Sequence, residues 1–153
     1  MKDWNKTFMQ VAELFAEHST CARLHVGAVL VKDRRIISCG YNGTPSGMKH
    51  CEDVFKDVDL DNPEIRKNGV HHEFSLKYEL HAEQNCLAYA AKTGVCIDDK
   101  CVLYTTTAPC TDCAKLIVAV GIKKVLFKDL YRRTSDGIRF LEEAGVEIKQ
   151  IDK

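Results

Sequence analysis

Apolar side chains recur at helical spacing along the first part of the chain. Between Trp4 and His18, polar residues separate five of them: Trp4, Phe8, Val11, Ala12 and Phe15. Spacings of three and four residues are typical of an amphipathic helix that packs one face on a core. We therefore expect a helix here, which the polar pair Ser19-Thr20 ends.

Further along, apolar residues run together instead of recurring. Val26–Val31 is a nearly continuous apolar run, as in a strand that is buried on both faces. The polar segment Lys32–Arg35 then turns the chain, and Ile36–Tyr41 predicts an antiparallel partner strand. Three later segments also predict strands, the last of them at a sheet edge: Val102–Thr106, Lys124–Phe127 and Val146–Ile151.

Helical patterns alternate with these later strands. One helix is expected to follow His81. A second runs from Pro109 to Gly121, with proline near its start and glycine past its end. Ser135 is expected to cap a third. A hairpin followed by alternating strands and helices predicts an α/β domain of three layers with a mixed sheet.

The segment from Met48 to Val70 interrupts this alternation. It is polar and rich in aspartate, and it lacks any clear hydrophobic period. Loops of this length are uncommon in compact domains, and they tend to be functional or mobile. We expect residues 1–153 to form a single domain with an insertion at about 48–78, which something other than a hydrophobic core keeps ordered.

Composition and charge narrow the class of protein. Lys+Arg and Asp+Glu both number 22, whereas a nucleic-acid binder usually carries a basic excess. We therefore expect a small-molecule substrate or a protein partner, and no nucleic acid. No apolar run approaches the roughly 18 residues of a membrane span, and none follows Met1–Trp4 as a secretory signal would require. Eight cysteines in such a chain favour metal or thiol chemistry in a reducing cytoplasm.

Two short motifs carry the candidate chemistry. His81-Ala82-Glu83 is followed later by Pro109-Cys110-Thr111-Asp112-Cys113, the two-part pattern of zinc deaminases that act on a nucleobase. One imidazole and two thiolates give Zn²⁺ three protein ligands and leave its fourth position for water, as in a catalytic site. Glu83 is then free to move protons between water, ring nitrogen and leaving amine.

Other interpretations of these residues are a structural zinc knuckle and a set of buried Cys and His without metal. A structural site usually closes with four ligands, and the motif holds no fourth Cys or His. Buried free cysteine behaves as a small hydrophobe. We therefore expect the four cysteines beside apolar segments to lie in the core: Cys39, Cys86, Cys96 and Cys101.

Over nearly its whole length the chain resembles the cytidine/deoxycytidylate deaminase superfamily, and within it the deoxycytidylate (dCMP) branch. The segments that carry the resemblance are Val26–Val29, Gly40–Pro45, His81–Asn85, Pro109–Lys115 and Gly121–Val125. The resemblance implies a three-layer α/β/α sandwich with a five-stranded mixed sheet. It also implies hydrolysis of dCMP to dUMP, the precursor of dTMP, by a homohexamer that dCTP activates and dTTP inhibits.

Cys21, Cys51, His71 and Glu79 resemble, in order and spacing, the second zinc site of phage-type members of that superfamily. Such a set would close a structural site and hold the insertion in place. His72 is an alternative to His71, because a slip of one residue would exchange them. Scattered residues in a mobile loop are the other interpretation.

Asn42 is the candidate substrate contact outside the zinc motif, although Asn42-Gly43 is also a common turn. Tyr131-Arg132-Arg133 could reach a nucleotide phosphate or form a solvated loop. Two other functions remain open. One is deamination of tRNA or single-stranded nucleic acid, which the neutral charge disfavours. The other is an idle nucleotide-sensing relative, which would not need Glu83.

Overall fold

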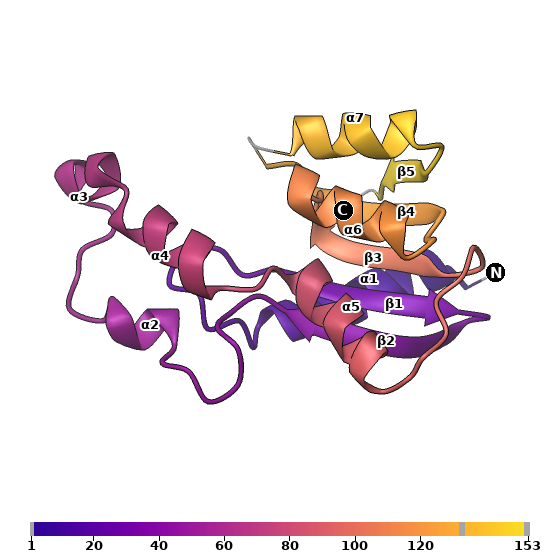
Figure 1. The fold of residues 1–153 in the computed structure, drawn as a ribbon, viewed down its shortest axis with the longest axis horizontal. Coiled ribbons are helices and arrows are strands. Elements are labelled where there is room, and N and C mark those ends of the chain that lie inside the picture. The colour runs from indigo at the N-terminus through magenta and orange to yellow at the C-terminus, as the bar shows by residue number, and fades with distance from the viewer. Residues whose placement is uncertain (1, 132–133, 152–153) are drawn as a thin grey trace.

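A five-stranded mixed sheet forms the centre of the protein in the computed structural model, which describes residues 2–131 and 134–151. The strands are β1 (Gly27–Lys32), β2 (Arg35–Tyr41), β3 (Val102–Thr107), β4 (Lys124–Asp129) and β5 (Glu147–Gln150). Their order across the sheet is β2-β1-β3-β4-β5. β1 is antiparallel to β2 and β3, whereas β3, β4 and β5 are parallel. The predicted hairpin, mixed sheet and edge position of the last strand are confirmed (Figure 1).

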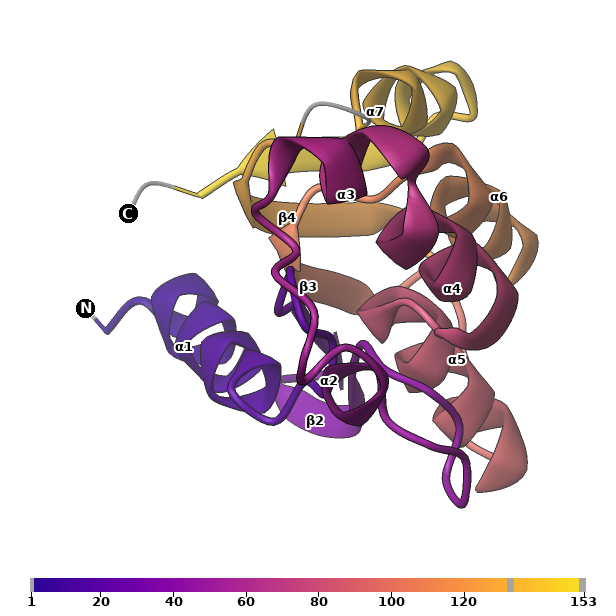
Figure 2. The same cartoon turned by 90° about the vertical axis from the view of Figure 1, so that its left-hand side faces the viewer.

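Helices cover both faces of this sheet, so the three-layer prediction is also confirmed (Figure 2). The first face carries α1 (Trp4–Ala16), and the second carries α5 (Ala82–Lys92), α6 (Thr111–Ala119) and α7 (Ser135–Glu143). Each face buries its own apolar cluster. Phe8 and Ala12 of α1 pack with Tyr104, while Leu87 and Ile117 pack on the other side. The first cluster fixes α1 on the sheet, and the second fixes α5 and α6 on the opposite face.

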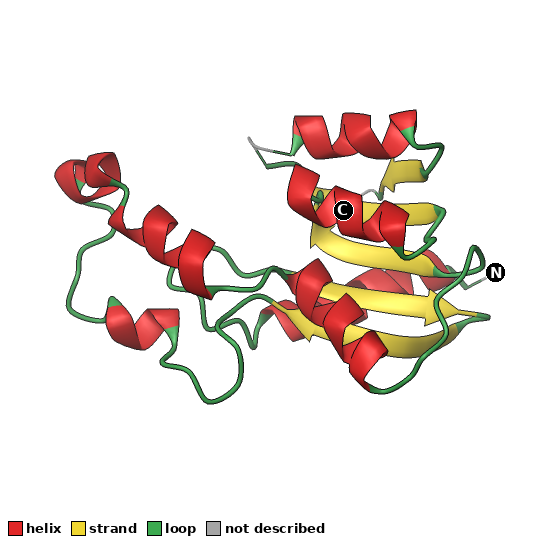
Figure 3. Cartoon of the chain, in the orientation of Figure 1, coloured by secondary structure: helices red, strands yellow, loops and turns green. Residues whose placement is uncertain are grey.

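The insertion is helical, although its sequence shows no clear hydrophobic period (Figure 3). It contains α2 (Cys51–Val54), α3 (Pro63–Asn68) and α4 (Val70–Tyr78), which lie beyond one end of the strands (Figure 1). Asn62 caps α3 by accepting a hydrogen bond from the Glu64 N–H, and Pro63 begins the helix. Neither α3 nor α4 buries any residue, so their sequences carry no apolar period that could have predicted them.

Two smaller predictions also need correction. Thr134, and not Ser135, is the N-cap residue of α7. Among the cysteines assigned to the core, Cys86 and Cys101 are buried, but Cys39 is half-buried and Cys96 is exposed. Cys96 lies between α5 and β3, where the chain crosses the surface.

The two ends of the insertion meet at a single antiparallel bridge between Gly43 and Leu80. The Gly43 N–H donates to the Leu80 carbonyl at 3.1 Å, and the Leu80 N–H donates to the Gly43 carbonyl at 2.9 Å. The bridge therefore joins the segment after β2 to the residue before His81.

Among the described residues, no helix combines the length and apolar character that a membrane span requires.

Candidate active site

The three predicted metal ligands of the main motif come together where two helices begin. His81 is the N-cap residue of α5, Cys110 is the N-cap residue of α6, and Cys113 lies in the first turn of α6. His81 Nδ1 is 3.4 Å from Cys110 Sγ and 3.3 Å from Cys113 Sγ. Tetrahedral zinc with ordinary bond lengths separates a nitrogen and a sulfur ligand by about 3.5 Å. The cluster therefore fits a zinc ion.

Charge in this cluster favours metal binding. A hydrogen bond from Cys113, together with contact to His81, lowers the pKa of Cys110 to about 4. Cys110 is therefore a thiolate at neutral pH, the form that binds metal. The hydrogen bond to Cys110 and burial raise the pKa of Cys113, which must lose its proton when a metal binds. The N-terminal dipoles of α5 and α6 both favour negative charge at this position.

Glu83 lies beside the ligands in the first turn of α5, and only 4% of its surface is exposed. Its Oε1 accepts a hydrogen bond from Thr105 Oγ1 at 3.0 Å, and its Oε2 lies 3.5 Å from Cys113 Sγ. Burial raises the pKa of this carboxyl, which is the direction that a general acid–base requires. The helix α5 packs closely on β2, because a Cβ atom on Gly40 would lie only 2.6 Å from the backbone nitrogen of Cys86. This contact fixes the distance between α5 and the sheet.

A cavity of about 560 Å³ opens above these residues. Its floor includes His81, Glu83 and Cys110, and its outer wall comes from the insertion and the segment before β1. Arg23 and Arg66 both line this outer wall. Among the described residues, no ion pair involves either arginine, although Arg23 Nη1 donates to the Leu60 carbonyl at 3.3 Å. The cavity is large enough for a small ligand and has a positively charged outer wall.

The four residues of the predicted second metal site also come together, as Cys21, Cys51, His71 and Glu79. Their ligand atoms lie within 4.8 Å of one another, and Cys21 Sγ is 3.5 Å from His71 Nε2. His71, and not His72, belongs to this cluster, although both histidines line the cavity.

Glu79 Oε1 is buried, and no hydrogen bond to it is found among the described residues. An uncompensated buried oxygen is costly, and a cation would compensate it. Burial raises the pKa of both thiols, Cys21 and Cys51, and lowers the pKa of His71. The donor set therefore fits a buried zinc ion that displaces the thiol protons.

The predicted substrate contacts, Asn42 and Tyr131, lie at the same cavity. The Asn42 side chain accepts a hydrogen bond from the Val26 N–H at 2.8 Å and donates one to the Leu24 carbonyl at 2.7 Å. Asn42 thus fixes the segment before β1 while it lines the cavity. Tyr131 lines the cavity with 47% of its surface exposed. Arg132 and Arg133 lie outside the described residues.

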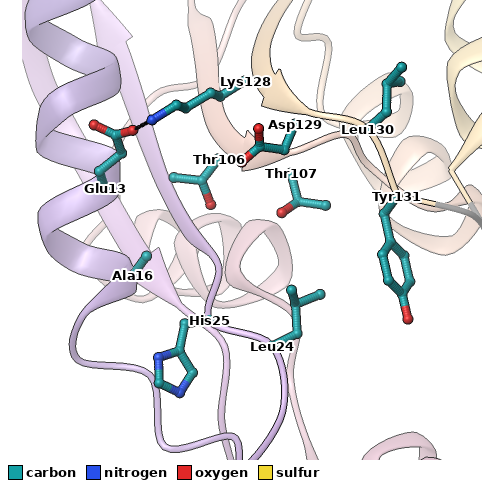
Figure 4. A pocket seen from close by; sticks show the side chains of 10 residues that line it. All are labelled: Glu13, Ala16, Leu24, His25, Thr106, Thr107, Lys128, Asp129, Leu130 and Tyr131. Carbon is teal, nitrogen blue, oxygen red and sulfur yellow. Dashed lines mark hydrogen bonds and ion pairs between the residues drawn. The ribbon is translucent and has the colours of Figure 1, made fainter. Parts of the chain in front are cut away.

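A smaller cavity of about 270 Å³ lies beside the first, near the end of α1 (Figure 4). The two cavities share Leu24, Thr107 and Tyr131 as lining residues. An ion pair between Glu13 and Lys128 crosses one side of the smaller cavity (Figure 4). Of the predicted site residues that the structure describes, Tyr131 alone lines it.

Comparison with known proteins assigns a family to this arrangement. Residues 2–129 match the family described as the cytidine and deoxycytidylate deaminase zinc-binding region. The chain belongs to this family. A deoxycytidylate deaminase of Enterobacteria phage T4 is 34% identical, over 96% of this chain and 89% of the relative. The ComE operon protein 2 of Bacillus subtilis is also 34% identical, over 97% of this chain and 71% of that protein.

Solved structures support the deaminase fold. The dCMP deaminase of cyanophage S-TIM5, in complex with dCMP and dUMP, is 38% identical over 99% of both chains, with a TM-score of 0.79. A tRNA:A34 deaminase is only 20% identical, with a TM-score of 0.61, so that likeness concerns the fold alone. The five-stranded deaminase sandwich expected from the sequence is therefore confirmed.

Proposed function

We propose that the protein catalyses the zinc-dependent hydrolytic deamination of dCMP to dUMP. The observation that carries this proposal is the cluster of His81, Cys110 and Cys113 with the buried Glu83 carboxylate beside it. Three protein ligands leave a coordination position open, as a catalytic zinc site requires. The dCMP deaminases among the relatives support the choice of nucleotide.

The cluster would hold the zinc ion, which when bound lowers the pKa of water and so supplies a nucleophile at neutral pH. The Glu83 carboxylate accepts the proton that the attacking water loses, and delivers it to N3 of the cytosine ring. Glu83 then takes the remaining proton from the new hydroxyl group at C4 and passes it to the departing amino group. Water and dCMP thus yield dUMP and ammonia, with Glu83 returned to its starting state.

The second cluster would hold a structural zinc ion. Two thiolates, one imidazole and one carboxylate fill all four positions of a tetrahedral ion, so no position is left for substrate. A small apolar group around Phe55 also orders the insertion, but α3 and α4 bury no residue. Zinc at Cys21, Cys51, His71 and Glu79 would therefore fix the insertion over the cavity.

The insertion would in turn select a nucleotide over a nucleoside. Arg66 of α3 and Arg23 line the same cavity as Glu83, and a 5′-phosphate needs cationic partners. Their guanidinium groups can bind phosphate oxygens in pairs. We assign them to phosphate binding, and we retain Asn42 and Tyr131 as contacts to the sugar or base.

Replacing Arg66 with alanine is expected to raise KM for dCMP by roughly 10-fold or more, since charge-assisted hydrogen bonds to phosphate are among the strongest. The much slower turnover of deoxycytidine, which has no phosphate, should not change. Steady-state kinetics with both substrates measure the effect. Arg35→Ala provides the control, because Arg35 is exposed on β2 and does not line the cavity. An equal loss on both substrates would contradict the assignment.

The proposed activity itself is tested by ultraviolet-monitored turnover of dCMP, deoxycytidine, CMP and a single-stranded oligonucleotide. We expect rapid turnover of dCMP alone. Activity on deoxycytidine but not dCMP would overturn the choice of substrate. Activity on the oligonucleotide would favour a nucleic-acid deaminase, and no activity on any of the four would favour a nucleotide-sensing relative.

Further proposals rest on resemblance to the family and on composition. They are activation by dCTP, inhibition by dTTP, a homohexameric assembly and a cytoplasmic location. We also propose that residues 1–153 form one deaminase domain carrying the insertion at about 48–78. Neither nucleic acid nor a membrane is among the proposed partners, given the equal numbers of acidic and basic residues.

A further inference from the structure

Thr105 places a hydroxyl group in an apolar layer directly beneath the catalytic helix. It lies on β3, two residues after Leu103, so both side chains point to the face that α5 and α6 cover. Thr105 is completely buried, and its strand neighbours are Ala28 of β1 and Phe127 of β4. Burying a hydroxyl group costs free energy unless the group is hydrogen-bonded, and valine would fill the same space without that cost. The buried hydroxyl group of Thr105 therefore needs a hydrogen-bond partner.

Two acceptors lie within reach of this hydroxyl. Thr105 Oγ1 is 3.0 Å from Glu83 Oε1 and 2.9 Å from the backbone carbonyl of Thr107. A hydroxyl group has a single hydrogen, so it can donate fully to only one of them. A carboxylate is the stronger acceptor, because hydrogen bonds to ionised groups are roughly twice as strong as those between neutral groups.

We propose that Thr105 is a positioning residue for proton transfer by Glu83. Its hydroxyl group holds Oε1, and the other oxygen, Oε2, then faces the ligand cluster, 3.5 Å from Cys113 Sγ. Oε1 remains an acceptor whether or not Oε2 carries a proton. Oε2 is therefore the oxygen that takes the proton from water and releases it to the substrate. This inference rests on the proposed deaminase function.

The test compares three variants at two adjacent threonines. Thr105→Val removes the hydroxyl group and keeps the shape, Thr105→Ser keeps the hydroxyl group, and Thr106→Val is the matched control. Thr106 is also buried, but its side chain points to the α1 face, where Oγ1 accepts a hydrogen bond from the Gly27 N–H at 3.1 Å. Each protein is assayed for kcat and KM with dCMP, zinc content, Tm and the solvent deuterium isotope effect on kcat.

Thr105→Val is expected to lower kcat by roughly 10- to 100-fold, with KM within about threefold of wild type, zinc content unchanged and a larger isotope effect. Thr105→Ser should restore kcat to within about threefold of wild type. Thr106→Val should lower Tm, because the Gly27 N–H loses its acceptor, while kcat stays within about twofold.

Wild-type kcat in Thr105→Val would overturn the inference, and so would a loss of zinc in that variant. Should the valine variant not fold, Thr105→Ser decides alone, since a loss of kcat beyond about tenfold with the hydroxyl group retained contradicts the proposal. A wild-type protein that does not deaminate dCMP would instead overturn the proposed function, and this inference with it. Turnover by wild type with an unimpaired valine variant overturns this inference only.

Discussion

Replacing Glu83 with glutamine is expected to lower kcat for dCMP by roughly 1,000-fold while both zinc ions stay bound. A positioned general acid–base contributes about 100- to 10,000-fold, and here one carboxylate serves every proton transfer of the reaction. Glutamine has nearly the same shape as glutamate but cannot accept and release a proton. Steady-state kinetics on purified protein, with metal analysis of the same samples, measure the effect.

Glu142→Gln is the matched control for this experiment. Glu142 is exposed on α7, outside both cavities, so the same chemical change there should leave kcat unaltered. Substantial dCMP turnover by Glu83→Gln would show that another group moves the protons. Loss of zinc from Glu83→Gln would show instead that Glu83 supports the ligands.

Replacing Cys51 with serine is expected to reduce the zinc content from two ions per chain to one. Cys51 is fully buried, and loss of a structural metal belongs to the few changes that cost more than about 4 kcal/mol in free energy of unfolding. For a protein of this size such a loss lowers Tm by roughly 10 °C. Metal analysis and thermal unfolding of the same samples measure both effects.

Cys96→Ser controls for the removal of a thiol, since Cys96 is exposed and belongs to neither cluster. It should leave zinc content and Tm unchanged. The Cys51→Ser protein should also show a raised KM for dCMP, because Arg66 lies on the insertion that the second zinc would hold. A wild-type zinc content of one per chain would refute the second site.

The spacing of apolar residues explains why so much of the sheet could be predicted from the sequence. β1 is buried on both faces, so its apolar residues run without interruption, and the helices that cover it repeat their apolar residues with a different period. The first metal cluster was predicted because its two-part motif, His-x-Glu followed later by Pro-Cys-x-x-Cys, is the pattern of zinc deaminases. The second cluster was predicted from the resemblance of its four residues to a site in phage-type members of the family.

Features that depend on burial or strand register could not be predicted in this way. The helices α3 and α4 bury no residues, so their sequences carry no periodic signal. Thr105, Thr106 and Thr107 are identical in type, and only their register in β3 decides which hydroxyl group meets Glu83. Arg66 lies 15 residues before His81, and it lines the active-site cavity because the folded insertion brings it there.

The bridge between Gly43 and Leu80 brings the two ends of the insertion side by side. Since its two ends already lie side by side, residues 44–79 close a loop whose length hardly affects the sheet. Doubling the length of a flexible loop costs only about 0.6 kcal/mol in closure entropy. Under the proposed role of Arg66, substrate preference can therefore diverge through changes in the length or charge of the insertion, while the strands and the helix that carries Glu83 stay as they are.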